Sequence, residues 1–204
     1  GYTEGTVGFG LDILATAGFK LDASAKYAGT GNLPRDTATN EPASSYGEIG
    51  VTGKAKISQT ELKIGTLRPM NPVLVASPAR LLPQTYRGIS LESKDLKDFE
   101  LQAAYIDKVN QRDSTNFENI RISAVNGRFK NAETDGLYYA GGYYNVNPSL
   151  RLGLFYLDVN NLYDQWTTGF LHKWEINPTT RLSSYLHYYR SRDEGNAKAG
   201  LVDN

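Results

Sequence analysis

The chain contains no cysteine, and its 22 lysines and arginines are balanced by 22 aspartates and glutamates. The absence of cysteine excludes disulfides, thiolate metal sites and cysteine nucleophiles. The absence of net charge removes the overall field that would hold nucleic acid or an anionic membrane surface. No run of 18 apolar residues occurs in the sequence, and this excludes a membrane-spanning helix.

Methionine is almost absent too, with one residue in 204, whereas there are 14 tyrosines and 20 glycines. Aromatic residues favour strands, and glycine is common in turns. We therefore expect an all-β fold.

Strand periodicity is clearest near the start of the chain. Between residues 7 and 21 the odd positions are apolar, and the even positions include Gly8, Asp12 and Lys20. Fifteen residues in one strand register extend over about 50 Å at roughly 3.3 Å per residue, compared with about 17–20 Å for a strand of a typical globular domain. This length indicates the wall of a tall barrel.

The same alternation predicts about nine strands in all. Residues 120–130 are too irregular to assign. Two matching turns, Asn147-Pro148-Ser149 and Asn177-Pro178-Thr179, close hairpins 30 residues apart, because Asn-Pro before a small hydroxyl residue starts a turn. The expected strands are 7–21, 49–57, 61–64, 89–93, 99–105, 137–145, 150–159, 165–176 and 181–190.

The connections between these strands alternate in length. Short turns at 58–59, 94–98, 146–149 and 177–180 alternate with long connections at 23–45, 69–87 and 106–135, and only the link 160–164 is short where a long one is expected. Outer-membrane barrels have short periplasmic turns, long external loops, and strands with apolar residues outward and polar residues inward. We therefore expect Val51, Leu101 and Leu152 to face hydrocarbon, and Lys54 and Glu100 to face water.

Nine antiparallel strands cannot close a bacterial barrel, because these barrels use even strand numbers and lipid tolerates no unpaired strand edge. The sequence is therefore expected to be a fragment of a larger barrel.

Five stretches spread over the chain resemble the OprD family of substrate-specific outer-membrane porins, in the family's order. They are residues 5–12 (GTVGFGLD), 30–34 (TGNLP), 80–85 (RLLPQT), 162–165 (LYDQ) and 190–200 (RSRDEGNAKAG). The resemblance implies a monomeric, 18-stranded antiparallel transmembrane barrel in the outer membrane of a Gram-negative bacterium, with residues 1–204 as its middle part. It also implies a pore narrowed by an inward-folded loop, here at about 69–87, opposite a ladder of basic side chains that conducts carboxylates.

The composition of residues 69–87 suits that role independently of the resemblance. Four prolines stiffen a segment that has no sheet partners. Its apolar side chains would be costly on an exposed loop, so we expect them to pack on the inner barrel wall. These side chains are Val73, Leu74, Val75, Leu81 and Leu82.

Arg80 and Arg87 flank the second half of this loop, and each offers a planar, permanently charged donor to a passing carboxylate. The alternative is that either arginine ties the loop to an acidic wall residue. Tyr86 is a further candidate for a carboxylate hydrogen bond, or else an anchor of the loop.

Further basic residues are candidates for the lumen wall. Lys54, Lys56 and Lys63 lie on the polar faces of paired strands, where Glu48 and Glu61 could neutralise them. Arg190 and Arg192 either guard the pore entrance or lie at the level of the lipid headgroups, where cations are tolerated.

Motifs for catalysis or cofactor binding are not found. His172 and His187 have no third ligand at metal spacing, so we expect no metal site. The sequence has no nucleophile elbow or phosphate loop, and we expect neither a cofactor nor enzymatic activity.

The sequence thus predicts an outer-membrane porin, a passive channel for small water-soluble solutes, with carboxylates such as amino acids as its expected substrates. Its expected partners are outer-membrane lipid, lipopolysaccharide and these solutes, without nucleic acid. Two alternatives stay open: a soluble β-barrel that binds a small ligand in its interior, and an outer-membrane barrel enzyme such as a lipase or protease.

Overall fold

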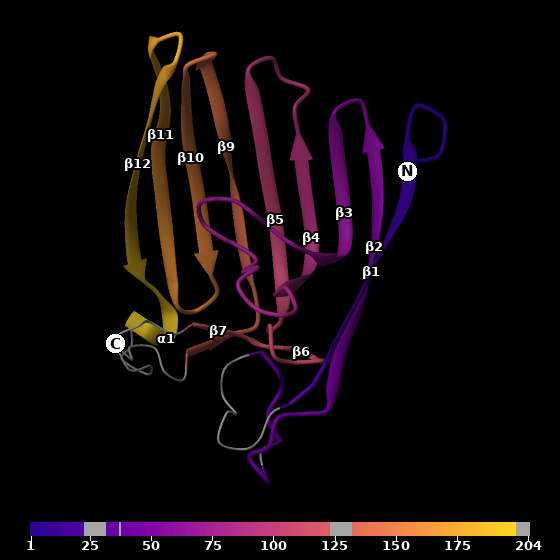
Figure 1. Ribbon diagram of the computed structural model, residues 1–204. Coiled ribbons are helices and arrows are strands. Elements are labelled where there is room, and N and C mark those ends of the chain that lie inside the picture. Colours follow the sequence, from indigo (N-terminus) through magenta and orange to yellow (C-terminus); the bar gives the residue numbers. More distant parts are fainter. Residues whose placement is uncertain (23–31, 37, 123–131, 199–204) are drawn as a thin grey trace.

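The computed structural model describes residues 1–22, 32–36, 38–122 and 132–198. One antiparallel sheet dominates it (Figure 1). Its main strands are β1 (Gly8–Phe19), β2 (Ser45–Ile57), β3 (Thr60–Leu67), β4 (Thr85–Ser93), β5 (Phe99–Asn110), β9 (Leu137–Asn147), β10 (Leu150–Val159), β11 (Tyr163–Asn177) and β12 (Thr180–Asp193).

The nine strands lie in the order in which they occur in the sequence, so each pairs with the next main strand along the chain. Their number and antiparallel pairing confirm the prediction from periodicity. Most strands extend beyond the predicted limits: β2 begins at Ser45 rather than 49, and β5 continues to Asn110 rather than 105. β4 begins at Thr85, so the last three residues of the expected loop 69–87 belong to a strand.

The two faces of the sheet differ in chemistry. We call the face crossed by the β3–β4 loop (residues 68–84) the inner face, and the opposite one the outer face (Figure 1). On the outer face Val51, Leu101 and Leu152 are 49%, 39% and 41% exposed. The neighbouring positions in alternation carry Lys54 and Glu100, which form ion pairs on the inner face. The sides are therefore as expected for a barrel wall in lipid.

The buried core lies between the inner face and the segments that cover it. Its members come from several strands and from the β3–β4 loop, and they include Leu67, Ala76, Tyr86, Ala104, Ile106, Val109, Leu137, Tyr139, Leu157 and Val159. This core explains why β9 and β10 carry apolar residues on both faces near one end.

At one end of the sheet the strands are joined by tight turns. In two of them an asparagine closes the turn: the side-chain oxygen of Asn147 accepts bonds from the backbone N–H groups of Ser149 and Leu150 at 2.9 Å each. Asn177 accepts the backbone N–H of Thr179 at 3.0 Å. The repeated Asn-Pro turns thus share one mechanism, in which a side chain replaces a backbone acceptor.

The opposite end carries the longer connections. β6 (Phe117–Glu118) pairs with β5, and β7 (Ile120–Ile122) pairs with β8 (Ala132–Thr134) in a small second sheet. Residues 120–122 of the stretch left unassigned from sequence are therefore a strand, and 123–130 lie outside the described residues. No helix among the described residues is long and apolar enough to cross a membrane.

The short β10–β11 link at this end is covered by a helical turn, α1 (Gly195–Lys198). The backbone N–H groups of Glu194 and Asn196 donate to the carbonyls of Leu162 and Asn161 at 2.8 Å each. The family-like stretch 162–165 therefore lies against residues 190–198 of the other.

Asp95 links two adjacent turns, and its contribution depends on pH. It accepts the backbone N–H of Gln59 at 2.9 Å and the hydroxyl of Thr60 at 2.6 Å. Hydrogen bonds from Ser58, Thr60 and Gln59 hold the pKa of Asp95 below its usual range. Because the folded-state pKa is the lower one, the ionised carboxylate stabilises the fold fully at pH values above the unfolded-state pKa of about 3.9. This stabilisation is lost as the pH falls through the folded-state pKa.

We therefore expect the Gln59 amide to be protected from hydrogen exchange. Its protection factor, the intrinsic rate divided by the observed rate, should be nearly constant above about pH 4 and should fall at lower pH. The Asp95→Asn variant should show weaker protection without this acid step. Equal pH dependence in both proteins would contradict this role for Asp95.

Candidate functional site: the inner face beneath the loop

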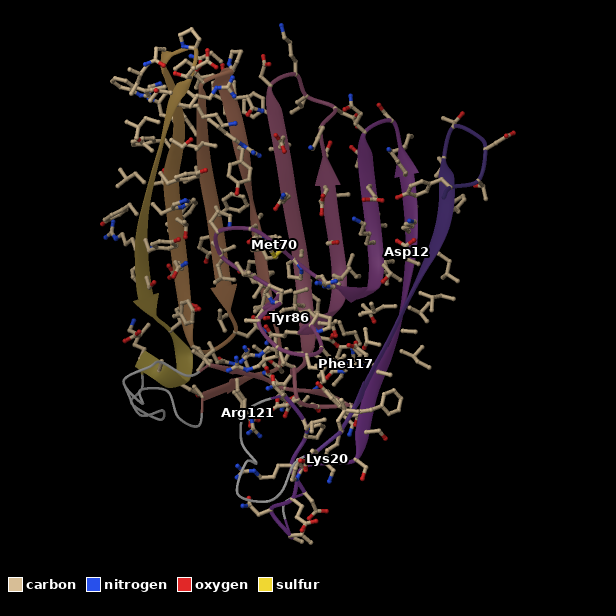
Figure 2. The ribbon with its side chains drawn as sticks, viewed as in Figure 1. Asp12, Lys20, Met70, Tyr86, Phe117 and Arg121 are labelled. Carbon is tan, nitrogen blue, oxygen red and sulfur yellow. The ribbon has the colours of Figure 1, made fainter. Side chains whose placement is uncertain are left out.

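The β3–β4 loop is shaped by a hydrogen-bonded turn at its tip. The side-chain oxygen of Asn71 accepts the backbone N–H groups of Val73 and Leu74 at 3.1 and 2.9 Å. The N–H of Ala76 donates to the carbonyl of Pro69 at 2.8 Å. Figure 2 shows Met70, beside this turn, in front of the sheet. The tip is therefore held in shape by its own contacts.

Apolar packing attaches the tip to the inner face. Val73 and Leu74 pack against the buried core, while Ala76 and Leu82 are buried themselves. The expectation that all five large apolar residues of the loop pack inward is wrong for two of them, since Val75 and Leu81 are 52% and 54% exposed. A buried residue follows each of them in the chain, Ala76 after Val75 and Leu82 after Leu81.

The second half of the loop is closed by polar contacts. The N–H of Gln84 donates to the carbonyl of Ser77 at 3.1 Å, and its side-chain amide donates to Gln111 at 3.0 Å. Arg112 donates to the hydroxyl of Ser77 at 3.3 Å. This closure presents Arg80, which is exposed and forms no ion pair within the part of the chain that the structure describes; its one hydrogen bond is to the carbonyl of Ala79 at 3.1 Å.

Tyr86 and Arg87 lie in β4 and not in the loop. Tyr86, labelled in Figure 2, is 6% exposed and belongs to the buried core, which is the position that the alternative of a loop anchor requires. Arg87 binds the carboxylate of Asp107 on β5, with its Nε 3.0 Å from Oδ1. The tie to an acidic wall residue is thus the observed arrangement for Arg87.

The three lysines predicted for the lumen wall differ in their partners. Lys54 binds Asp12 of β1 at 2.6 Å, a partner that the sequence did not indicate. Lys63 binds Glu61 at 2.7 Å, as one of the alternatives expected. Lys56 lies 5.8 Å from the centre of the Tyr2 ring.

A cavity of about 360 Å³ lies on this part of the inner face. Side chains of both charge signs line it, among them Asp12, Lys63, Arg68 and Glu92.

The arginines of β12 lie in register with β11 near the end of the long connections. Arg190 pairs with Trp166, and Trp166 in turn lies 5.0 Å from Tyr156, ring centre to ring centre. Arg192 is 3.6 Å from Asp164. The alternation of β11 places Trp166 with Phe170 on the outer face, so this arrangement favours headgroup level for Arg190 over the pore entrance.

Sequence reasoning missed one cationic cluster on the inner face. Arg151 binds Glu100 at 3.0 Å and lies over the ring of Tyr143, 3.8 Å from its centre. Glu100 also binds Lys94 at 3.2 Å. The signal was available, because Leu150 and Leu152 were assigned to one face and Arg151 must then point to the other.

His172 lies on β11 and His187 on β12. The described residues hold no group of three histidines, aspartates or glutamates that could bind a metal ion.

A sheet with an apolar outer face, a charged inner face and a loop packed across that inner face has the construction of an outer-membrane channel wall. Comparison with known proteins identifies the family. The family model described as outer membrane porin, OprD family, matches residues 1–204. The chain therefore belongs to the OprD family, whose members are located in the outer membrane of Gram-negative bacteria.

Individual relatives agree with this assignment. Porin D of Pseudomonas aeruginosa is 31% identical over 205 residues, covering 100% of this chain and 45% of the relative. The porin-like protein GalP of Pseudomonas putida is 32% identical, covering 100% and 48%. The chain thus spans about half the length of these curated relatives.

Solved structures show the same fold. The crystal structure of Acinetobacter baumannii OccAB2 is 76% identical with a TM-score of 0.94, and the match covers 100% of this chain and 51% of that one. The structure of Pseudomonas aeruginosa OpdK with vanillate is 35% identical with a TM-score of 0.87, covering 98% and 50%.

Proposed function

We propose that the whole protein is a passive, substrate-selective diffusion channel of the outer membrane for small water-soluble solutes, with carboxylates such as amino acids among its substrates. The observation that carries the proposal is the packing of Val73 and Leu74 onto the charged inner face, because this holds the β3–β4 loop across the path along that face. We propose this loop, with Arg80 exposed on it, as the constriction.

The inner face supports conduction by balanced charges. A carboxylate that loses water in a narrow passage regains hydrogen bonds from an arginine. Acidic neighbours such as Asp12 and Glu92 keep any one site from holding the solute too tightly, and conduction requires this balance. No bond is made or broken in this process, so the function needs no catalytic group.

The outer face supports a barrel in lipid rather than a soluble one. A soluble barrel would bury large apolar side chains, whereas here they are exposed along every main strand, including Phe9, Ile13, Ile49, Ile64, Ile89, Leu154, Phe170 and Leu186. We propose that phospholipid and lipopolysaccharide contact this face, and that the complete barrel acts as a monomer.

Ion selectivity of the whole protein in planar bilayers tests the role of Arg80. Arg80→Ala should lower the preference for anions and reduce carboxylate currents severalfold, because a permanent positive charge leaves the constriction. Arg80→Lys should keep most of the anion preference, since the charge remains.

The control is Arg181→Ala, which removes an exposed arginine paired with Glu175 beside the short β11–β12 turn. It should leave selectivity unchanged. Equal selectivity of the wild type and Arg80→Ala would remove Arg80 from the solute path.

A further inference from the structure

One row across the inner face consists of two glycines between two rings. In the register of the sheet, Tyr143 of β9 pairs with Gly153 of β10, Gly153 with Gly169 of β11, and Gly169 with His187 of β12. Glycine in a strand interior weakens the sheet and often marks a place where a ligand comes close to the backbone. Two adjacent glycines therefore indicate a flat floor between the flanking rings.

A side chain at either glycine would crowd its neighbours on this floor. A Cβ atom at Gly153 would lie 3.2 Å from two ring carbons of Tyr143, and one at Gly169 would lie 2.4 Å from the carbonyl oxygen of Leu186 and 3.1 Å from Nδ1 of His187. A side chain at Gly153 would press on the Tyr143 ring, and one at Gly169 would collide with the backbone of β12. Glycine at both positions therefore keeps the space between the two rings open.

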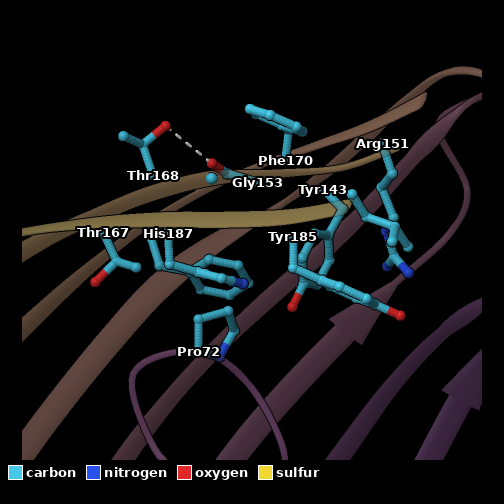
Figure 3. Close-up of a pocket in the computed structure, with 12 residues that line it drawn as sticks. Pro72, Tyr143, Arg151, Gly153, Thr167, Thr168, Phe170, Tyr185 and His187 are labelled. Atoms are coloured by element: carbon cyan, nitrogen blue, oxygen red, sulfur yellow. Dashed lines mark hydrogen bonds between the residues drawn. The ribbon is translucent and has the colours of Figure 1, made fainter. Parts of the chain in front are cut away.

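Two further residues complete the walls. Pro72, from the tip of the β3–β4 loop, and Tyr185, two residues before His187, line the same space. Figure 3 shows both on the same side of the sheet as His187, with Phe170 on the opposite side. The space has a volume of about 160 Å³, close to the cavity of roughly 150 Å³ that accepts benzene in an engineered protein. One six-membered ring therefore fits.

The end of this space near Arg151 is cationic. The charge of Glu100 is shared between Arg151 at 3.0 Å and Lys94 at 3.2 Å, so two cations face one carboxylate. The Nε atom of Arg151 is buried and has no hydrogen-bond partner among the described residues. A buried donor without a partner is costly, and the uncompensated positive charge of the guanidinium favours an anionic group at this end of the space.

We infer that the inner face carries a ring slot, formed by Tyr143, Tyr185, His187 and Pro72 over Gly153 and Gly169, that binds the planar ring of an anionic solute with its anionic group toward Arg151. The inference rests on the proposed channel function and adds to it a preference for solute shape. Planar rings stack on Tyr and His faces, whereas puckered rings make poorer contact.

Block of single-channel chloride current by two matched solutes tests the slot. Benzoate and cyclohexanecarboxylate have the same charge and nearly the same size, but only benzoate has a planar ring. In the wild-type whole protein, half-block should need roughly two- to tenfold less benzoate than cyclohexanecarboxylate, the range expected for one aromatic contact. In the Tyr185→Ala/His187→Ala variant the two concentrations should become equal.

Three matched variants separate stacking from other effects. Tyr185→Phe/His187→Phe keeps two planar rings and should keep the benzoate preference. Tyr188→Ala removes a tyrosine of the same strand that pairs with Thr168 on the outer face, and it should also keep the preference. Tyr185→Ala alone removes a side chain that is 68% exposed, so it should fold and lower the preference partly.

Equal half-block concentrations in the wild type, or an unchanged preference after loss of both rings, would overturn the ring slot while leaving the channel in place. A wild-type protein without any ion current would instead overturn the proposed function, and the slot with it, since the slot is part of a water-filled passage.

Discussion

Replacement of Leu74 by aspartate should open the proposed constriction. Leu74 packs against the buried core beneath the β3–β4 loop, and a carboxylate there loses its water without gaining a partner, which costs several kcal/mol. The tip should leave the inner face, so single-channel conductance of the whole protein should rise severalfold and anion selectivity should fall. Current–voltage recordings in potassium chloride gradients measure both quantities.

Val75→Asp is the matched control for this experiment. It adds the same charge one residue further along the same loop, but at a side chain that is 52% exposed. Conductance should stay close to the wild-type value. If conductance rises equally in both variants, the added charge alone explains the rise. If it rises in neither, the loop has not moved. Either result would mean that the packing of Leu74 is not what holds the loop in place.

The second large effect is expected at Gly65 of β3. Its backbone has a φ angle of +130°, and a Cβ atom would lie 2.1 Å from the carbonyl oxygen of Val51 on β2. Gly65→Ala should cost roughly 1–3 kcal/mol in backbone strain alone, with the steric conflict added to it. The fraction of the whole protein that stays folded in urea should fall sharply. This fraction can be measured from the difference in gel migration between unheated and heated samples.

Gly53→Ala tests whether this loss is specific. Gly53 lies in the same hairpin, opposite Ile64, and the nearest atom to an added Cβ would be the carbonyl oxygen of Ile64 at 3.9 Å. This substitution should change the unfolding midpoint little. A similar loss in both variants would mean that β2–β3 tolerates no added methyl group, and that neither the φ angle nor the close approach at Gly65 is decisive.

Much of the sheet could be predicted because the strands repeat a simple alternation. Apolar residues such as Val51, Leu101 and Leu152 recur at every second position over long stretches, because each face of a strand has a single environment along most of its length. The alternation also indicates which polar residues share the inner face. Strand ends are harder to predict where the loop covers the inner face, because that face is apolar there and the alternation disappears, as at Val109 near the end of β5.

The candidate site was harder to predict because its contacts join distant parts of the sequence. Lys54 was expected on the inner face, but its pairing with Asp12 depends on the register between β1 and β2. The sequence places Tyr86 in the loop, because β4 begins where the loop covers the inner face and the start of such a strand shows no alternation. The contact of Arg151 with Tyr143 depends on cross-strand register in the same way.

The position of the β3–β4 loop has a consequence for the order in which the molecule assembles. Each main strand pairs only with its sequence neighbours, so hairpins can be added one after another as the chain becomes available. The loop, however, rests on a core that includes Tyr139 and Leu157, and these belong to β9 and β10, which follow it in the chain. A nascent wall that ends at β5 therefore lacks part of the core on which the loop packs, and the loop gains its full set of apolar contacts only after the β9–β10 hairpin has been added.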